Sequence, residues 1–308
     1  MSAALPPSSK CCAEEAAVQP RFERVALLGV GLIGGSLALA ARAAGVFGFV
    51  IGAGRTMANL EEAKRRGIVD TYTQDLPAAV HGADLVVLAV PVRSMATVVA
   101  VCRDALVPGA IVTDVGSVKR FVLDTVEPLL PPGVAFVGAH PIAGIEASGA
   151  AAATPDLFRG RRCVLTPGAR SDPASLARIR KLWETVGMEV VETTPEEHDA
   201  ALAWVSHLPH VLAFAAARAL EARCPTAAAY AGPSFASLTR VAASSAETWV
   251  DIFLANRDAV ERALDGFLSA VAEMRSLLDA GKAEELHAWL EACRQAHQRH
   301  IDAQGKNR

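Results

Sequence analysis

The sequence predicts an α/β protein in which a doubly wound, mostly parallel sheet is followed by an all-helical domain. Short apolar runs typical of strands alternate with helical patterns as far as residue 193, and the connections between them are short. Beyond that point helical periodicity continues and little of the chain reads as strand. We therefore expect a disordered tail over residues 1–20, a sheet domain over 21–193 and a helical domain over 194–308.

The first predicted strand, Arg24–Leu28, leads into a glycine cluster and then into an alanine-rich helical segment. The cluster reads G-x-G-x-x-G, in which Gly29 allows the tight turn, Gly31 lets a pyrophosphate approach the backbone and Gly34 lets the helix pack on the strand. Since the chain contains 23 glycines, the pattern gains its weight from the strand before it, the helix after it and the strand-like run at 49–51. It predicts a Rossmann-type dinucleotide-binding domain, with an ordinary glycine-rich turn as the alternative.

The remaining strands are predicted from apolar runs, of which 83–90 is the most continuous and is typical of a strand buried on both faces. The others are 110–115, 135–138, 163–166 and 189–192, and a helix over 56–66 ends at Gly67. Asp172 and Pro173 begin another helix as its cap and first residue, and Gly187 ends it. This alternation predicts parallel strands in a doubly wound sheet.

The helical domain is predicted to begin at a capping box formed by Thr194, Pro195 and Glu197. Apolar residues over 260–278 recur at helical spacing, and 284–300 is a further candidate helix. By analogy at the level of the fold, a helical domain behind a nucleotide-binding domain often binds substrate and forms dimers.

Composition excludes several classes of protein. Apolar residues make up 52% of the chain, which suffices for substantial cores, and the net charge of −3 provides no basic surface for a nucleic acid. The six cysteines are scattered without a C-x-x-C pair, which indicates reduced thiols in the cytoplasm. The tail lacks the apolar core of a signal peptide, and the apolar stretch 211–220 is interrupted by Arg218 and is too short to cross a bilayer. We expect a cytoplasmic protein without a membrane or nucleic-acid partner.

The loop after the second strand indicates which dinucleotide is bound. It reads Gly52-Ala53-Gly54-Arg55-Thr56, with no carboxylate for the ribose hydroxyls of NAD. Arg55 can pair with a 2′-phosphate and Thr56 can donate a hydrogen bond to it. NADP is therefore favoured over NAD, with a solvated Arg55 as the alternative.

Two polar stretches, 113–119 and 138–149, follow neighbouring predicted strands. Because ligands of open α/β sheets lie outside the carboxyl ends of the strands, Ser117 and His140 should face the cofactor cleft. Considered separately, each residue could have only a structural role, since serine often caps a helix and a loop histidine is often a hydrogen-bonded surface residue.

The helical domain contains Ser206-His207-Leu208-Pro209-His210, which is unusual because a proline inside a helix removes a backbone hydrogen bond at a cost of about 3 kcal/mol. A metal site is the alternative interpretation of the two histidines, although no ligand spacing such as H-E-x-x-H accompanies them.

These motifs occur in a fixed order between about Arg24 and about Leu278: G-x-G-x-x-G-G-S, D-V-G-S-V-K, G-A-H-P-I-A-G-x-E-x-S-G, V-S-H-L-P-H and L-T-R, followed by W-V-D-I-F. The set resembles the prephenate/arogenate dehydrogenase family of tyrosine biosynthesis. The resemblance implies NAD(P)-dependent oxidative decarboxylation of prephenate or arogenate, giving 4-hydroxyphenylpyruvate or tyrosine, in a homodimer held together by the helical domains.

The resemblance also implies roles for individual residues. His140 matches the catalytic histidine that accepts the proton of the ring hydroxyl, and Ser117 matches the serine that orients it. Substrate contacts are expected from Arg240, which binds a carboxylate, and from His210, Ser206, Glu146 and Trp249, the last reaching the partner subunit's site. Cofactor contacts are expected at Gly29, Gly31, Leu32, Ile33, Gly34, Arg55, Thr56, Val90, Pro91 and Asp114, and no metal is expected.

The chain departs from the family pattern at several positions. Gly54 and Arg55 replace the usual acid after the second strand, Ile145 stands where some members have threonine, and Ala236 and Ser237 replace a charged pair. The choice between prephenate and arogenate and any feedback inhibition by tyrosine therefore stay open. No chorismate-mutase segment or regulatory domain is expected. Another reductase with a Rossmann domain and a helical domain, or a non-catalytic NADP-binding dimer, is the alternative reading.

Overall fold

The computed structural model describes residues 21–145 and 147–305, and within these ranges eight strands form one sheet in the order β3-β2-β1-β4-β5-β6-β7-β8. The strands are β1 (Phe22–Leu28), β2 (Phe47–Ala53), β3 (Thr71–Thr73), β4 (Leu85–Leu88), β5 (Ile111–Asp114), β6 (Ala135–Pro141), β7 (Arg162–Pro167) and β8 (Glu189–Glu192). All neighbours are parallel except the antiparallel pair β6 and β7. The first six strands have the Rossmann order, so the predicted fold class is confirmed. The predicted tail over 1–20 lies outside the described residues.

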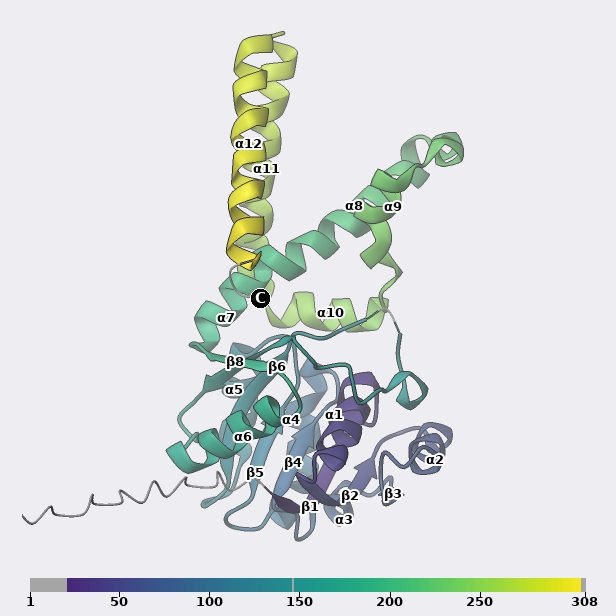
Figure 1. Cartoon of the computed structure of the whole chain (residues 1–308), viewed down its shortest axis with the longest axis vertical. Helices are drawn as coiled ribbons and strands as arrows, with labels where there is room; N and C mark the ends of the chain where they lie inside the picture. The colour runs from purple at the N-terminus through teal and green to yellow at the C-terminus, as the bar shows by residue number, and fades with distance from the viewer. Residues whose placement is uncertain (1–20, 146, 306–308) are drawn as a thin grey trace, which may run out of the picture.

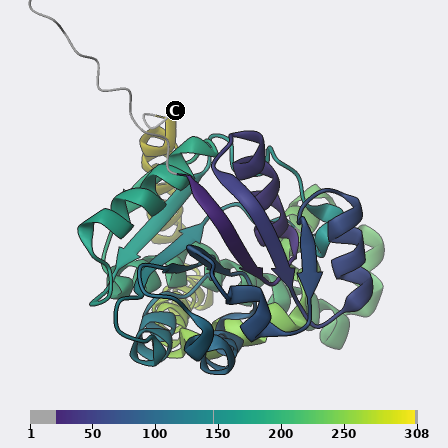
Figure 2. The ribbon, with the colours of Figure 1, turned by 90° about the horizontal axis from the view of Figure 1, so that it is seen from below.

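Helices cover both faces of the sheet (Figure 2). One face packs against α1 (Leu32–Ala43), α2 (Met57–Arg65) and α6 (Pro173–Thr185), and the other against α3 (Leu76–Val80), α4 (Met95–Cys102) and α5 (Arg120–Val126). Strand β1 serves both cores, since Val25 and Leu27 point to the first face and Ala26 and Leu28 to the second. This two-sided burial explains why the central strands read as almost continuous apolar runs.

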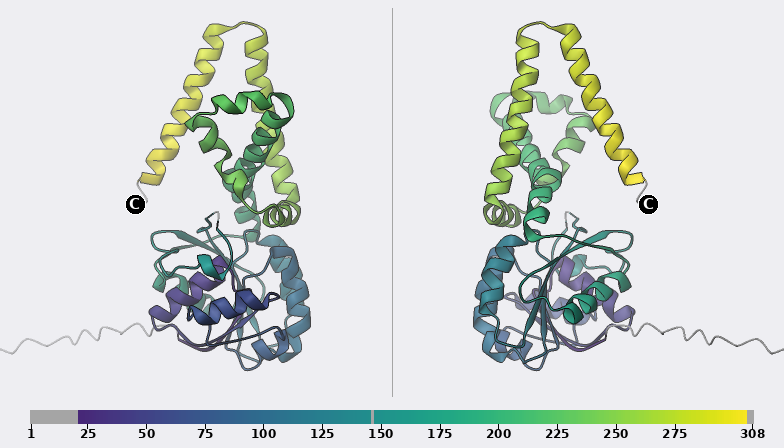
Figure 3. Two further views of the ribbon diagram at one scale, coloured as in Figure 1. Left: turned by 90° about the vertical axis from the view of Figure 1, so that its right-hand side faces the viewer. Right: turned by 90° about the vertical axis from the view of Figure 1, so that its left-hand side faces the viewer.

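The helical part begins two residues after β8. It comprises α7 (Pro195–Leu202), a π-helical turn η5 (Ala203–His207), α8 (Leu208–Arg223), α9 (Pro233–Thr239), α10 (Ala246–Ala255), α11 (Arg257–Asp279) and α12 (Ala283–Gly305). The predicted capping box is present at the start of α7. Helix α10 lies against the sheet domain, where Trp249 and Ile252 join its core, whereas α11 and α12 form a hairpin that extends away from the sheet (Figures 1 and 3).

The segments α7, η5 and α8 join into one uninterrupted helical run, Pro195–Arg223. Among the described residues this run alone is long and apolar enough, by length and composition, to cross a membrane. The prediction from the sequence covered only residues 211–220, which are too short to cross a bilayer. The helix that contains them is longer, because a π turn lets it continue through Pro209.

Candidate active site

The glycine loop after β1 is shaped by close backbone contacts. Gly29 has φ +96°, and a Cβ there would lie 2.3 Å from the carbonyl oxygen of Ala89. A Cβ on Gly34 would lie 2.6 Å from the carbonyl oxygen of Gly29. Gly31 differs, since a Cβ there would meet nothing within 4 Å. It is the N-cap of α1 and, as a glycine, provides no side-chain acceptor for the first N–H groups of the helix. The space beside Gly31 and the first turn of α1 therefore fits the pyrophosphate of a dinucleotide.

Four other predicted cofactor contacts surround this loop. Leu32 and Ile33 form the first turn of α1, and Val90 and Pro91 follow the carboxyl end of β4. The Cγ1 atom of Val90 lies 3.0 Å from the position that a Cβ on Gly29 would take. These residues thus stand at the point where β1 has β2 on one side and β4 on the other, which is where doubly wound sheets bind nucleotides.

The loop between β2 and α2 carries the two residues predicted to select the cofactor. Arg55 and Thr56 are both exposed, and the carbonyl oxygen of Arg55 accepts a hydrogen bond from the Gln74 side chain at 2.5 Å. Thr56 caps α2, but its hydroxyl makes no capping hydrogen bond, and the first turn of α2 holds no acidic residue. Asn59 ties this helix to the glycine loop by donating to the carbonyl oxygen of Val30 at 2.7 Å. An anion bound here would meet a guanidinium, a hydroxyl and a helix N-terminus.

The carboxylate of Asp114, another predicted cofactor contact, is fully buried. It forms an ion pair with Lys119 and accepts the backbone N–H groups of Gly116 at 2.8 Å and Ala139 at 3.1 Å. Lys119 in turn donates to the carbonyl oxygen of Ala139 at 2.8 Å. The buried pair therefore joins the loop after β5 to the end of β6, the two segments that carry the predicted catalytic residues.

His140 lies near the end of β6, is 7% exposed and begins a buried chain of three side chains. Its Nδ1 atom lies 2.8 Å from Nε2 of His198, whose Nδ1 atom lies 2.7 Å from a carboxylate oxygen of Asp199. Burial, followed by the positive charge of neighbouring side chains, holds the pKa of His140 well below its usual range. The pKa of His198 is also lowered, again mainly by burial. Both rings are therefore neutral at pH 7, and His140 can accept a proton.

Ser117 is half-buried in the loop after β5, two residues before Lys119. Strands β5 and β6 are neighbours in the sheet. Ser117 therefore follows the end of β5, and His140 lies in the last residues of β6, which extends to Pro141 and not only to the predicted residue 138.

The helical domain contributes an aromatic cluster at its contact with the sheet domain. The rings of His210 and Trp249 stack with centroids 3.5 Å apart and an interplanar angle of 23°. The Nδ1 atom of His210 donates to the carbonyl oxygen of Ser206 at 2.9 Å. Trp249 is 9% exposed and packs against the sheet domain of its own chain, and its reach toward a partner subunit stays a prediction.

The metal-site interpretation of His207 and His210 finds no further ligands. His207 is fully buried, and its Nδ1 atom lies 3.2 Å from the side-chain nitrogen of Asn256, while Trp249 covers the ring of His210. Across residues 21–145 and 147–305 no group of three or more His, Cys, Asp or Glu side chains is arranged to hold a metal ion.

Two predicted substrate contacts remain. Arg240 begins the short 3₁₀ helix η7 (Arg240–Ala243) directly after α9 and is exposed. This turn contacts α8, the helix that carries His210, so these two residues belong to adjoining elements. Glu146 lies outside the described residues.

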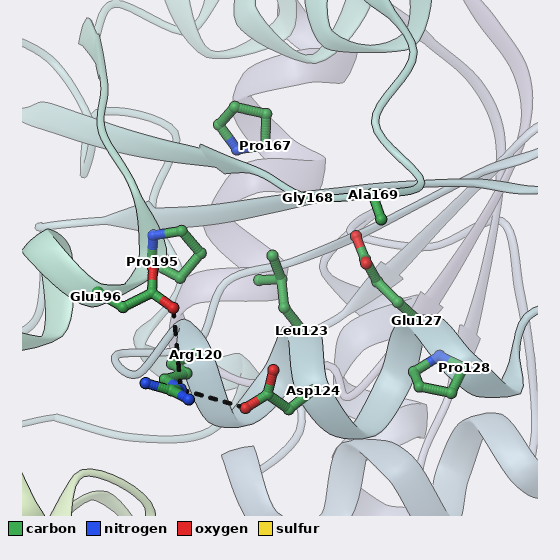
Figure 4. A pocket seen from close by; sticks show the side chains of 10 residues that line it. All are labelled: Arg120, Leu123, Asp124, Glu127, Pro128, Pro167, Gly168, Ala169, Pro195 and Glu196. Carbon is green, nitrogen blue, oxygen red and sulfur yellow. Dashed lines mark hydrogen bonds and ion pairs between the residues drawn. The ribbon is translucent and has the colours of Figure 1, made fainter.

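A surface hollow beside α5 is separate from this site (Figure 4). It is lined by Arg120, which pairs with Asp124 at 3.4 Å and with Glu196 at 3.9 Å, and by Pro167–Ala169. None of the catalytic, substrate or cofactor residues predicted from the sequence lines it. The candidate active site is therefore the carboxyl edge of the sheet, where those residues gather.

Sequence reasoning missed four buried polar residues that support this edge: Lys119, His198, Asp199 and Asn256. Lys119 lies in the D-V-G-S-V-K motif, two residues after Ser117. His198 and Asp199 lie directly after the capping box, where charged residues are usually attributed to the helix end. The available signal was that His198 and Asp199 stand at the point where this helix changes from acidic to apolar residues.

A glycine loop that fits a dinucleotide and a neutral, buried histidine, both at the carboxyl ends of strands in one sheet, are the parts expected of a nicotinamide-dependent dehydrogenase. Residues 37–192 match the family model described as prephenate dehydrogenase, nucleotide-binding domain, and residues 194–292 match that of the prephenate dehydrogenase dimerization domain. The chain belongs to the prephenate dehydrogenase family, as the motifs indicated.

Named relatives agree with this assignment. The chain is 36% identical to a cyclohexadienyl dehydrogenase of Zymomonas mobilis, over 83% of this chain and 89% of the relative. It is similar to the structure of prephenate dehydrogenase from Aquifex aeolicus in complex with hydroxyphenyl propionate and NAD⁺, with a TM-score of 0.84, 33% identity and coverage of 90% and 98%. A Synechocystis arogenate dehydrogenase gives a TM-score of 0.77, 30% identity and coverage of 90% and 99%. The chain is thus an NAD(P)-dependent enzyme of oxidative decarboxylation. It is neither a reductase of another family nor a non-catalytic NADP-binding dimer, the two alternatives that the sequence left open.

Proposed function

We propose that this enzyme oxidises prephenate, arogenate or both with NADP, releasing carbon dioxide and leaving 4-hydroxyphenylpyruvate or tyrosine. The relatives named for cyclohexadienyl, prephenate and arogenate substrates support this substrate class. The observation that carries the proposal is the neutral, buried His140 at the carboxyl end of β6, in the same sheet that carries the nucleotide loop at the carboxyl end of β1.

In the proposed reaction, His140 accepts the proton of the ring hydroxyl while the carbon bearing that hydroxyl loses a hydride. NADP supplies the hydride acceptor. The carbonyl that forms at this carbon draws the electron pair of the bond to the carboxylate into the ring, so carbon dioxide leaves and the ring becomes an aromatic phenolate. The phenolate oxygen takes the proton back from His140, which gives the phenol. Ser117, on the neighbouring strand end, orients the hydroxyl and His140. A base with a pKa near or below neutrality suits this step, since it is unprotonated before hydride leaves.

Substrate carboxylates are assigned to the helical domain. A guanidinium such as that of Arg240 binds a carboxylate in a two-pronged geometry that lysine cannot reproduce. His210 and Ser206 share a hydrogen bond on one helical turn, and Trp249 holds the ring of His210 by stacking. Glu146 is assigned to the site entrance by resemblance alone.

NADP is favoured by the loop between β2 and α2. The exposed guanidinium of Arg55, the hydroxyl of Thr56 and the N-terminus of α2 offer positive charge and hydrogen-bond donors to a 2′-phosphate. No carboxylate stands in the loop to hold the ribose hydroxyls of NAD. The Aquifex aeolicus relative was crystallised with NAD⁺, so the preference for NADP is inferred from this chain's own residues.

A homodimer formed by the helical domain is part of the proposal. The buried core of that domain within one chain is small, consisting of Ala203, Leu208, Ala259 and Ala263. Large apolar side chains on α11 and α12 are about half exposed: Leu268, Val271, Leu278 and Leu290. A second copy of the chain would cover such a surface. We place the enzyme in the cytoplasm because Cys102 and Cys163 are free, buried thiols.

The test is an assay of the purified protein with prephenate or arogenate, each combined with NADP or NAD. Turnover with NADP and at least one substrate is expected, followed by the appearance of reduced cofactor. His140→Asn is the matched variant, and it should lower kcat by about 10²–10⁴-fold while NADP binding is preserved. Absence of turnover in all four combinations would contradict the proposed substrates, and full activity of the variant would remove His140 from the mechanism.

A further inference from the structure

The carboxylate at the end of the buried chain is fixed as a hydrogen-bond acceptor. One oxygen of Asp199 accepts the backbone N–H of Lys119 at 2.8 Å, and the other accepts the backbone N–H of Arg120 at 3.0 Å. These two donors cannot change roles, because a backbone amide only donates. An ionised Asp199 has no proton to give, so the Nδ1 atom of His198 must carry the proton in the bond that joins them.

That assignment determines the tautomers of both histidines. A neutral His198 with its proton on Nδ1 has a lone pair on Nε2, so the hydrogen bond at 2.8 Å is donated by Nδ1 of His140. His140 then keeps its own lone pair on Nε2. This is the only ring nitrogen left to accept a proton from substrate, and the lowered pKa values of both histidines agree with neutral rings.

We propose that His198 and Asp199 are positioning residues that hold His140 in the Nδ1–H tautomer and so present Nε2 as the catalytic base. The proposal rests on the proposed role of His140. His140 belongs to the sheet domain, whereas His198 and Asp199 lie in α7 of the helical part. The amide donors to Asp199 come from the loop and helix after β5. The correct tautomer therefore depends on the contact between the two parts of the chain.

The test compares two substitutions of His198. In His198→Asn, the amide lies at the level of the original Nδ1, so it can donate to Asp199 but does not reach His140. In His198→Gln, the longer side chain can bring an amide oxygen to the level of the original Nε2, where it accepts from His140. We expect the asparagine variant to lose about 10–10²-fold in kcat, with the KM values for substrate and NADP within about threefold of wild type. The glutamine variant should recover most of that loss.

The tautomer itself is read from the imidazole ¹⁵N chemical shifts of His140, assigned by comparison with His140→Asn. Wild-type enzyme should show a protonated Nδ1 and an unprotonated Nε2, and His198→Asn should show a mixture of tautomers. His81→Asn, at an exposed histidine of the sheet domain, is the control and should change neither the kinetics nor the His140 shifts.

Three outcomes would overturn the proposal: a protonated Nε2 in wild type at neutral pH, unchanged kcat in His198→Asn, or equal losses in the asparagine and glutamine variants. Each is distinct from a failure of the proposed function, because that failure would be seen in wild type as absence of turnover.

Discussion

The surroundings of His140 favour its neutral form from several directions. The ring is buried beside helix α7, and a proton on it would lie near the positive charge of Lys119 after β5 and near two further histidine rings, His198 on α7 and His207 in the π turn. An imidazole in water would be partly protonated at neutral pH, whereas this one is not. The base is thus available over a wider range of pH than a free histidine.

The pH dependence of kcat/KM tests this property. Protonation of His140 removes the base, so activity should fall as the pH decreases, and the lowered pKa places that fall below pH 6.5. The pKa of His207 is lowered to about 4, so the unfolded chain binds more protons than the folded chain between about pH 6.5 and pH 4, and folding stability declines there. Initial rates should therefore be taken directly after dilution into each buffer, with recovery on return to neutral pH as the control. A midpoint at or above pH 6.5 would contradict the assignment.

Among the elements, the β2–α2 loop can be tested for cofactor recognition without disturbing the fold. Its backbone is held by the Gln74 side chain, which donates to the carbonyl of Arg55, and the helix that follows is held to the glycine loop by Asn59. The Arg55 side chain itself is exposed. Its substitution should therefore alter ligand binding without disturbing the strand or the helix.

Arg55→Ala should raise the KM for NADP by about tenfold or more, because a hydrogen bond to a charged group contributes about 1.5–3 kcal/mol. The KM for NAD should change by less than about threefold, since NAD has no 2′-phosphate to lose. Arg103→Ala removes the same charge from a partly exposed position of the same domain and serves as the control. Equal effects on both cofactors would show that Arg55 does not recognise the phosphate.

Across the whole molecule, the two parts of the chain differ in how completely they are buried. The sheet domain has two extensive cores, whereas the helical part buries few residues by itself and extends α11 and α12 into solvent. The family model for this part is that of a dimerization domain. The helical run Pro195–Arg223, which is apolar but only partly buried within one chain, fits the same interpretation.

The dimer is tested by placing charge on α11. In the double variant Leu268→Glu and Val271→Glu, two half-exposed apolar side chains become carboxylates, which would be costly to bury against a second chain. Sedimentation velocity should give twice the chain mass for wild type and a shift toward monomer for the variant. Val101→Glu, at an exposed position of α4 in the sheet domain, should remain dimeric. A monomeric wild type would refute the proposed assembly.

Much of the fold was predictable because its signals are local. The glycine loop, the apolar strands and the capping box are each set by a few consecutive residues. Strand β3 escaped notice because it is three polar residues at a sheet edge, and the antiparallel direction of β7 because strand direction depends on partners distant in sequence. The hydrogen bond between His140 and His198 joins positions 58 residues apart, and no local pattern contains it.

The π turn at Ala203–His207 determines which way the following helix faces. In a regular α-helix each residue turns the chain by about 100°, so twelve residues would leave His198 and His210 about 120° apart around the axis. A π turn accommodates one extra residue, which reduces the offset to about 20°. One continuous helix can thus present a histidine to His140 near its start and another to Trp249 further along, on almost the same side. A single inserted residue thus sets the rotation of the helix about its axis, so that the same helix contacts both His140 of the sheet domain and Trp249 of α10.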